Sequence, residues 1–361
     1  MRAAVIGTGL IGGSIGLALV ELGHDVVGFD RDPDRLARAR ELGAVRSIAV
    51  DLEEAATGAD VAFVALPVGA IADAAARLLD AGVPLVTDVG SVKGLVVADV
   101  ARRCPKRTNR FVGGHPMAGS EQDGIDGARA DLFVGAAWVL TPTPATAEDA
   151  YTTLSGLVRD LQAEVVAVTP EDHDVLVSFV SHVPQLAAST LMDVATTHEA
   201  QHRALLRLAA GGFRDMTRIA ASHPTIWLDT LTSNRDAILG ALDSYVVGLQ
   251  NAREIVAAGD REALKALLDR ARAARRNLPV GISMTTKLVE LRVPVPDRPG
   301  VLAEVTTLAG RLGVNVADVE IAHSKEGGAG VLVLIVAADE AGAFEAGLHD
   351  LGYHTGRTDI S

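Results

Sequence analysis

The spacing of three glycines near the N-terminus constrains the fold of this chain more than any other feature. Residues 7–12 read Gly-Thr-Gly-Leu-Ile-Gly, at the end of an apolar, strand-like segment and at the start of a helical pattern. In this context Gly7 permits a tight turn, Gly9 lets the backbone approach a pyrophosphate, and Gly12 lets the helix pack closely on the strand. The N–H groups of the helix start favour phosphate charge, so the pattern predicts a dinucleotide-binding unit.

The segments that follow alternate between short apolar runs and helical patterns. Runs rich in Val and Ala, such as VAFVAL and PLVTDVG, are typical of buried strands, and segments such as VGAIADAAARLLDAG carry apolar residues at helical spacing. This alternation is typical of βαβ units. It predicts an α/β fold, a Rossmann-type, doubly wound and mostly parallel sheet over residues 1–170, with EVVAVTP as the last strand.

Two further domains are expected, because 361 residues exceed what one hydrophobic core usually organises. Residues 171–282 lack strand patterns and indicate an all-helical domain that closes over a substrate and forms a dimer. Residues 287–361 alternate again as β-α-β-β-α, with a short last strand near 356–360, and this order predicts a ferredoxin-like βαββαβ domain. The segment NLPVGISM between them is interpreted as a linker.

Charge and cysteine content exclude several partners and compartments. The chain has 46 acidic and 33 basic residues and a net charge of −13, which disfavours binding to nucleic acid and to anionic membranes. Cys104 is the only cysteine, so no internal disulfide forms. We expect no secretory signal, and no apolar run reaches the roughly 18 residues of a membrane span. These features predict a cytoplasmic protein.

The end of the second predicted strand bears on the identity of the dinucleotide. Asp30 follows Gly12 by eighteen residues, where a carboxylate meets a ribose 2′-hydroxyl and repels a 2′-phosphate. This favours NAD over NADP, although the adjacent Arg31 is able to pair with a 2′-phosphate and keeps NADP open. The alternative is a glycine-rich turn that binds nothing, with a solvated Asp30. The predicted cofactor residues are Gly7, Gly9, Leu10, Ile11, Gly12, Asp30, Arg31, Leu66, Pro67, Asp88 and Ser91.

Four polar clusters stand where strands end or helices begin. They are TDVGSVKG at 87–94, GGHPMAGSE at 113–121, SHVPQ at 181–185 and GGFRDMTR at 211–218. Together with GTGLIGGS, their order and spacing resemble the prephenate/arogenate dehydrogenases of tyrosine biosynthesis across roughly residues 1–280. The resemblance implies oxidation at C4 of a cyclohexadienyl substrate with loss of its ring carboxylate. The products would be a 4-hydroxyphenyl compound, carbon dioxide and reduced cofactor.

The residue types in the clusters suit this chemistry. Hydride leaves an alcohol carbon more easily if the hydroxyl proton leaves with it, and histidine is the natural general base near neutral pH. His115 is the candidate base, and the resemblance implies that it hydrogen-bonds the C4 hydroxyl. Ser91 is expected to orient this imidazole or the nicotinamide. Aromatisation of the ring drives decarboxylation, so neither a metal nor a second cofactor is expected.

An anionic substrate requires fixed positive charge in its pocket. Arg218 is the candidate, because a guanidinium binds a carboxylate through two parallel hydrogen bonds. Asp215, three residues earlier, is expected to hold Arg218 in place, and we hypothesise that Asp215 and Glu121 gate access. The predicted catalytic residues are His115, Ser91 and Arg218, and the predicted substrate-binding residues are Ser181, Gln185, Arg218, Asp215, Glu121 and Trp227.

Some residues near the predicted site allow more than one interpretation. Gln185 stands where some relatives carry a histidine. An amide does not titrate, so any contribution of that histidine to the pH dependence is absent here, and this departure leaves the choice between prephenate and arogenate open. Trp227 is either a core residue or, by family position, close to the subunit interface and the pocket. His182 is interpreted as a buried residue at a helix start. The other histidines, His173 among them, are interpreted as surface or structural residues.

The C-terminal part carries a second resemblance. VPVPDRPGVLAEVTTLAGRLGVNVADVEI resembles the opening of the ACT regulatory domain. N–H groups at its helix start are able to bind an amino-acid carboxylate, so tyrosine or phenylalanine is the expected allosteric effector; the alternative is a domain used only for dimerisation. Pairing of such sheets between subunits protects edge strands, and a homodimer is expected. The predicted effector-binding residues are Asp297, Gly300, Val301, Leu302 and Asn315.

Two other functions compete with this prediction. A dehydrogenase acting on a β-hydroxy acid uses a lysine of its helical domain as proton carrier, and here that block offers only Lys265, in a surface-like helix. A non-catalytic sensor of NAD and an amino acid has no need for His115, Ser91 and Arg218 together. We therefore predict an NAD-dependent prephenate dehydrogenase, with arogenate dehydrogenase as its alternative.

Overall fold

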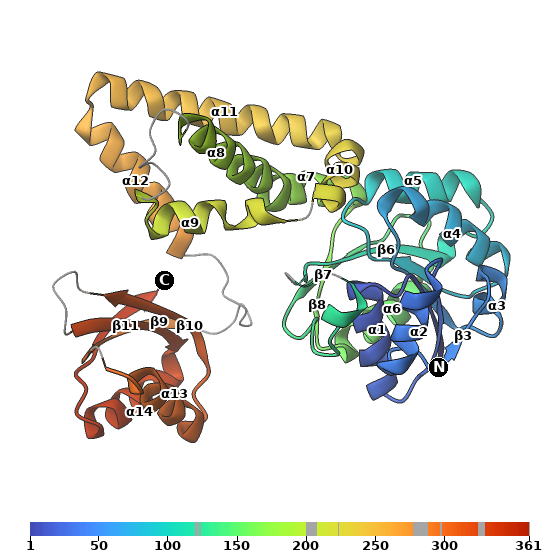
Figure 1. Cartoon of the computed structure of the whole chain (residues 1–361), viewed down its shortest axis with the longest axis horizontal. Coiled ribbons are helices and arrows are strands. Elements are labelled where there is room, and N and C mark those ends of the chain that lie inside the picture. Colours follow the sequence, from blue (N-terminus) through green and yellow to red (C-terminus); the bar gives the residue numbers. More distant parts are fainter. Residues whose placement is uncertain are drawn as a thin grey trace. The chain divides into compact units, whose positions relative to one another are not determined.

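The computed structural model describes residues 1–119, 122, 124–199, 208–222, 224–276, 288–296, 298–323 and 329–360 (Figure 1). The predicted linker and the predicted site residues Glu121 and Asp297 lie outside the described residues. The chain forms two compact units, residues 1–250 and 251–361. The first contains a large sheet and most of the helical block, and the second contains the small C-terminal sheet.

An eight-stranded sheet forms the core of the first unit, in the order β3-β2-β1-β4-β5-β6-β7-β8. Its strands are β1 (Arg2–Ile6), β2 (Asp25–Phe29), β3 (Ser47–Ile48), β4 (Val61–Val64), β5 (Val86–Asp88), β6 (Phe111–Pro116), β7 (Ala137–Thr141) and β8 (Glu164–Ala167). Every pairing is parallel except that of β6 with β7. A parallel return needs a long crossover, and the described part of the β6–β7 connection holds only the short 3-10 turn η2 (Ile125–Gly127). The predicted Rossmann-type sheet is confirmed, with this one antiparallel step.

Successive residues of the central strand β1 enter two separate cores. Ala4 and Ile6 face one core and Ala3 and Val5 face the other, as the two-residue period of a strand requires. The first core is covered by α3 (Leu52–Ala56), α4 (Val68–Asp80) and α5 (Gly94–Arg103), and the second by α1 (Leu10–Glu21), α2 (Pro33–Glu41) and α6 (Glu148–Asp160). Because both faces are covered, the central strands β1 and β4 are apolar over most of their length. Burial of each Ile or Val side chain stabilises the fold by roughly 1.5–3 kcal/mol.

The helical block begins at a capped helix start. The Thr169 hydroxyl accepts the N–H of Asp172 at 3.0 Å, and Pro170 lies in the first turn, where its missing N–H is not needed. The elements of the block are α7 (Pro170–Val177), the π-helical turn η3 (Ser178–His182), α8 (Val183–Glu199), α9 (Gly211–Thr217), the 3-10 turn η5 (Arg218–Ala221), α10 (Pro224–Ser233), α11 (Arg235–Ala258) and α12 (Arg261–Arg276). The long helical pattern in TIWLDTLTSNRDAILGALDSYVVGLQ is divided at Asn234.

One helical stretch of this block, Pro170–Thr197, has the length and the mean hydropathy, 1.4, of a membrane-spanning helix. It comprises α7, η3 and most of α8, and 33% of its most apolar window is buried. Buried polar side chains, among them His173 and His182, lie on this stretch. Buried core helices of other proteins have the same length and hydropathy, so these two properties are weak evidence of a membrane span.

A four-stranded antiparallel sheet forms the C-terminal domain, in the order β10-β11-β9-β12. Its elements are β9 (Leu288–Pro296), α13 (Val301–Leu312), β10 (Val316–His323), β11 (Ala329–Ala337), α14 (Ala338–Asp350) and β12 (Gly356–Ile360). Val289, Leu291 and Val293 on β9 share one buried cluster with residues of α13 and with Phe344 of α14. The predicted βαββαβ order is confirmed, including the short last strand.

Candidate active site

A cavity of about 520 Å³ opens at the carboxyl ends of the parallel strands. Loops after β1, β4 and β5 line it, and α10 of the helical block contributes Asp229 and Thr230. Doubly wound sheets bind their ligands at this edge. The lining residues are Gly9, Leu10, Ile11, Gly12, Arg35, Ala65, Leu66, Pro67, Val68, Val89, Gly90, Ser91, Gly124, Asp229 and Thr230. Most of the predicted cofactor residues are among them.

The three glycines of the N-terminal motif have different surroundings. Gly7 has φ +92°, and a Cβ there would lie 2.2 Å from the carbonyl oxygen of Ala65. A Cβ on Gly12 would lie 1.9 Å from the Gly7 carbonyl oxygen, so close packing requires glycine at both positions. A Cβ on Gly9 would meet nothing within 4 Å, and α1 has no side-chain cap and no acidic residue in its first turn. The N–H groups there suit pyrophosphate oxygens, and the residues fit a dinucleotide.

Asp30 lies directly after β2 with its carboxylate turned toward the glycine-rich turn. One oxygen accepts the N–H of Thr8 at 2.8 Å and its hydroxyl at 3.2 Å, and the other accepts the N–H of Asp32 at 3.0 Å. Arg35 lies 3.6 Å from the same carboxylate and lines the cavity. Arg31 is exposed and is not among the lining residues. The cation at the expected ribose site is therefore Arg35, which the sequence did not indicate.

A fully buried ion pair joins Asp88 and Lys93 below the loop that follows β5. The Lys93 Nζ also donates to the Gly114 carbonyl oxygen at 2.7 Å, and the Asp88 carboxylate accepts the N–H groups of Gly90 at 2.9 Å and Gly114 at 3.2 Å. Burial lowers the pKa of Lys93, and the charge of Asp88 opposes that shift. The Asp88 side chain faces these internal partners rather than the cavity, contrary to the predicted cofactor contact.

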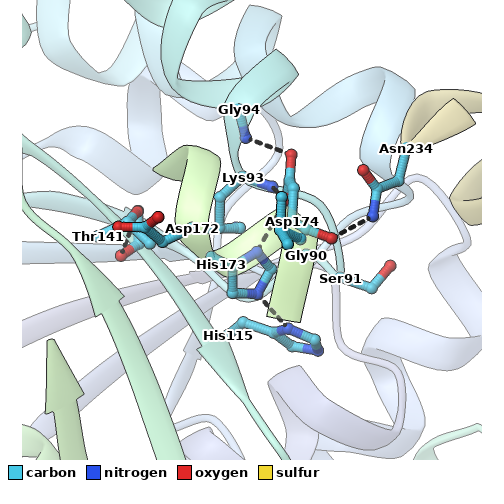
Figure 2. Close-up of polar contacts among 12 residues, drawn as sticks. Gly90, Ser91, Lys93, Gly94, His115, Thr141, Asp172, His173, Asp174 and Asn234 are labelled. Atoms are coloured by element: carbon cyan, nitrogen blue, oxygen red, sulfur yellow. Dashed lines mark hydrogen bonds and ion pairs between the residues drawn. The ribbon is translucent and has the colours of Figure 1, made fainter. Parts of the chain in front are cut away.

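His115, on β6, is the start of a chain of three side chains (Figure 2). Its Nδ1 lies 2.9 Å from Nε2 of His173, and Nδ1 of His173 lies 2.8 Å from a carboxylate oxygen of Asp174. The Asp174 carboxylate also accepts the N–H groups of Lys93 and Gly94 at the start of α5, each at 2.8 Å. The chain therefore connects β6 to α7 and α7 to α5.

The surroundings of His115 keep its imidazole neutral at pH 7. Burial is the largest cause that lowers the pKa of His115 well below 6.5, followed by the neighbouring His173, Lys93 and His182. Burial opposes charge on Asp174, yet hydrogen bonds from His173 and from two backbone N–H groups lower the pKa of this carboxyl. A neutral imidazole that is linked to a buried anion is suited to accept a proton.

Asn234, between α10 and α11, ties the helical block to this chain of side chains. Its amide donates to the Asp174 carbonyl oxygen at 2.8 Å and to Nδ1 of His182 at 3.2 Å. His182 is buried as predicted, and burial lowers its pKa to about 4. Its ring meets that of Trp227 edge to face, with centroids 6.2 Å apart. The division of the long helical pattern at Asn234 thus coincides with hydrogen bonds to other elements.

Ser91 lies at the carboxyl end of β5, lines the cavity and contacts the helical block. Its hydroxyl lies 2.8 Å from the hydroxyl of Thr230, a buried residue of α10 that lines the same cavity. The nucleotide-binding loops and the helical block therefore build one site.

Comparison with known families agrees with this geometry. The model for "Prephenate dehydrogenase, nucleotide-binding domain" matches residues 15–167, that for "Prephenate dehydrogenase, dimerization domain" matches 169–270, and that for the ACT domain matches 289–346. Prephenate dehydrogenase of Bacillus subtilis is 34% identical over 340 residues, which is 92% of this chain and 91% of that protein. The chain belongs to the prephenate dehydrogenase family. The resemblance inferred from the five motifs is confirmed.

Other proteins of this kind are similar in sequence and in structure. Cyclohexadienyl dehydrogenase of Zymomonas mobilis is 32% identical over 267 residues, 72% of this chain and 90% of that protein. Prephenate dehydrogenase from Aquifex aeolicus, in complex with hydroxyphenyl propionate and NAD⁺, aligns with a TM-score of 0.72 and 28% identity over 77% of this chain and 98% of that one. Synechocystis arogenate dehydrogenase aligns with a TM-score of 0.68 and 30% identity, over 76% and 99%.

In this member of the prephenate dehydrogenase family, two predicted substrate residues lie around the π-helical turn. Ser181 is partly buried within η3. Gln185 is buried in the first turn of α8, where its Nε2 lies 3.4 Å from the Ser189 hydroxyl. Over the described part of the chain, the Gln185 Oε1 has no hydrogen-bond partner. An unsatisfied buried acceptor of this kind suits a donor on a ligand.

The predicted pair Asp215 and Arg218 lies outside the buried network, since both side chains are exposed. Helix α9 ends at Thr217, and Arg218 begins the 3-10 turn η5, so the two residues do not share one regular α-helix as expected. Their ionic contact, and the convergence of Arg218 with His115 on one substrate, stay predictions.

Several residues of the site were not predicted from the sequence. They are Lys93, His173, Asp174, Thr230 and Asn234. His173, interpreted as a surface or structural residue, is 1% exposed and bonded to His115, so it belongs to the site. The Thr169 cap and Pro170 mark the start of α7 in the sequence, but they do not indicate the partners of His173 and Asp174. Across the described residues, no group of three His, Cys, Asp or Glu side chains is arranged to hold a metal ion.

The ACT domain presents most of the predicted effector residues at the start of α13. Gly300, with φ +94°, precedes the helix, and no side chain caps its first turn. Val301 is buried and Leu302 is exposed. The N–H of Asn315 donates to a carboxylate oxygen of Glu340 at 3.1 Å. Effector binding by these residues stays a prediction.

Proposed function

We propose that this chain is an NAD-dependent prephenate dehydrogenase in which His115 is the general base. The observation that carries the proposal is the position of His115, a neutral imidazole at the carboxyl end of β6. That strand pairs with β5, and the loop after β5 lines the cavity that fits a dinucleotide. The relatives named prephenate dehydrogenase support the choice of substrate.

Each part of the site has a task in this reaction. The N–H groups around Gly9 bind the pyrophosphate, and Asp30 accepts hydrogen bonds from a ribose. NAD supplies the hydride acceptor for the hydrogen on C4 of the substrate. His115 accepts the C4 hydroxyl proton as the hydride leaves, the ring carboxylate is lost as carbon dioxide, and the proton returns to the phenolate oxygen of the aromatic product. Ser91, held by Thr230, orients the reacting groups.

Arg218 binds a substrate carboxylate in this proposal. The chain as a whole is acidic, so a local guanidinium is needed to hold a dianion. Removal of this guanidinium in Arg218→Gln should raise KM for the substrate far more than KM for NAD. An unchanged KM for the substrate would remove Arg218 from the site.

Prephenate and arogenate differ only in the side chain opposite the hydroxyl, a keto acid in one and an amino acid in the other. Both carry the ring carboxylate and the C4 hydroxyl on which His115 acts. NADH formation by the purified chain, measured with the two substrates side by side, tests the proposal. We expect a larger kcat/KM with prephenate; a larger kcat/KM with arogenate selects the alternative substrate, and no NADH from either rejects the function.

The helical block gives no support for a β-hydroxy acid as substrate. Lys265, the lysine considered for that chemistry, lies on α12 with its side chain 77% exposed and paired with Asp269. A proton carrier at a reacting centre is shielded from water by the substrate and the protein, which this lysine is not. A non-catalytic sensor has no use for a neutral His115 beside the cofactor cavity.

We further propose that the chain works in the cytoplasm as a homodimer that an aromatic amino acid inhibits through the ACT domain. The match to a dimerization-domain model supports the dimer, and the ACT match supports a small ligand. Sedimentation should give twice the monomer mass. Tyrosine should lower the turnover of the parent more than that of Gly300→Val, because the left-handed φ of Gly300 disfavours a side chain.

A further inference from the structure

The two residues behind His115 carry an inference that rests on the proposed function and deepens it. Asp174 is the fixed end of the chain of side chains. Its two oxygens accept the N–H groups of Lys93 and Gly94, each at 2.8 Å. A carboxylate held in this way has no proton to donate, so the Nδ1 of His173, 2.8 Å away, is the donor in their hydrogen bond.

The protonation of one ring then determines that of the next. A neutral imidazole carries one N–H, and in the neutral form of His173 that N–H is at Nδ1, because the Asp174 carboxylate accepts it. The Nε2 of His173 is therefore an acceptor, and the donor that faces it at 2.9 Å is the Nδ1 of His115. His115 consequently keeps its lone pair on Nε2, the ring nitrogen on the side away from His173 (Figure 2).

We propose that His173 and Asp174 are positioning residues that hold His115 in the tautomer whose Nε2 accepts the substrate proton. His173 and Asp174 also stabilise the protonated form of His115. When His115 gains a proton, its Nδ1–H still donates to His173, and the positive charge is stabilised through that ring by the Asp174 carboxylate. The backbone directly after Asp174 is held by a residue between α10 and α11, since the Asn234 amide donates to the Asp174 carbonyl oxygen at 2.8 Å.

Burial and the basic groups near His115 oppose its protonation. Burial is the largest cause that lowers the pKa of His115, followed by His173 on α7, Lys93 before α5 and His182 on η3. Lys93 is paired with the buried Asp88. Among the described contacts, Asp174 is the negative charge that hydrogen bonds connect to His115, by way of His173. Loss of that charge should therefore weaken the base and lower its pKa further.

The test replaces the carboxylate by an amide. In Asp174→Asn, we expect kcat to fall about a hundredfold, because positioning of a general base is worth factors of roughly 10²–10⁴. The acid limb of the kcat–pH profile should move to lower pH, while KM stays within about threefold. A purely structural role would lower the amount of folded enzyme without moving that limb. In His173→Phe, which removes the acceptor, kcat should fall at least as far, and His173→Gln should recover part of it.

Asp172→Asn is the matched control. Asp172 lies on the same helix, two residues earlier, with its carboxylate exposed and 2.8 Å from the Thr169 hydroxyl. It makes the same chemical change outside the chain of side chains and should leave kcat and the pH profile unchanged. If Asp174→Asn behaves like Asp172→Asn, the positioning role is wrong.

A second measurement is made on the parent protein and does not depend on turnover. Nitrogen-15 NMR of histidine-labelled parent protein reports which ring nitrogen carries the proton, with His115 assigned by the signal lost in His115→Asn. A proton on Nδ1 of His115 supports the proposal, and a proton on Nε2 overturns it. If neither prephenate nor arogenate is oxidised, the proposed function fails while this readout still decides the tautomer. If substrate is oxidised and the proton is on Nε2, only the positioning role fails.

Discussion

The N-terminal unit buries charged and polar side chains, whereas the described core of the ACT domain is almost wholly apolar. Asp88, Lys93, His173 and Asp174 are at most 9% exposed in the first unit. In the second unit, Glu290 is the buried polar residue within the described ranges. A buried charge stabilises a fold only when its partners are complete. The buried polar groups of the first unit therefore point to a role in chemistry, whereas the apolar core of the second unit stabilises its fold.

The two glycine-started helices sharpen this contrast. Helix α1 begins at Gly9 with no acidic residue in its first turn and opens on the cavity. Helix α13 begins after Gly300, but Glu304 lies in its first turn, 3.0 Å from Arg298 and 2.6 Å from the Tyr353 hydroxyl. The helix start at α1, with free N–H groups and no acidic residue, thus suits a polyanion. At α13, the Glu304 carboxylate already lies at the positive end of the helix, so this start suits a polyanion less well.

The largest expected effect is on catalysis. His115→Asn removes the general base, and kcat with prephenate should fall about a thousandfold, with NAD affinity unchanged by calorimetry. His349→Asn, which alters an exposed histidine of α14, is the matched control and should keep full turnover. Retention of kcat in His115→Asn would mean that the buried network serves stability alone.

The next effect concerns the buried ion pair. Lys93→Met leaves Asp88 buried and unpaired, and the free energy of unfolding should fall by about 3–5 kcal/mol in urea titrations. Arg77→Met breaks an exposed pair with Glu53 and should change it by less than about 1 kcal/mol. Asp88→Asn combined with Lys93→Met should recover part of the loss. Equal effects of the two single variants would contradict the difference between buried and exposed pairs.

An apolar change in the ACT domain should separate stability from turnover. Leu291 is fully buried on β9, and Leu291→Ala should lower the free energy of unfolding of this domain by about 2–5 kcal/mol. Turnover without effector should stay at the parental level, because no residue of the proposed site lies there. Loss of turnover in proportion to the loss of stability would show that the two units do not act separately.

The smallest of these effects is a pH dependence of stability. Burial lowers the pKa of His182 to about 4, below its value of about 6.5 in the unfolded chain, so the unfolded chain binds the proton first as the pH falls. Stability contributed by the neutral ring is complete above pH 6.5 and decreases by at most about 3 kcal/mol toward pH 4. His182→Gln does not titrate, so its stability should fall less over that window. Parallel falls in the two proteins would contradict the low pKa.

Local patterns predicted the elements of both units. The glycine motif, the alternation of strands with helices and the order βαββαβ depend on neighbours in sequence, and the structure agrees with them. The antiparallel return of β7 follows from the connection before it, which lacks a crossover helix over its described residues.

The partners of buried polar groups were beyond local patterns. Nothing near His173 indicates that His115, 58 residues earlier, is its hydrogen-bond partner. Asn234 interrupts a regular helical pattern because it bonds Asp174 and His182, both far away in sequence. Lys93 stands inside a quoted motif, but a lysine is rarely buried unless paired, and the pairing becomes visible only in the fold.

The central claim is that a neutral His115, at the carboxyl end of β6, accepts the proton as prephenate is oxidised. The pH dependence of kcat/KM for prephenate, at saturating NAD, tests it most directly, because it reports the base of the free enzyme. We predict an activity that is constant near neutral pH and declines only well below pH 6.5, since the active form is unprotonated and its pKa is lowered. An acid limb at or above pH 6.5, or activity that rises on acidification, would contradict the account.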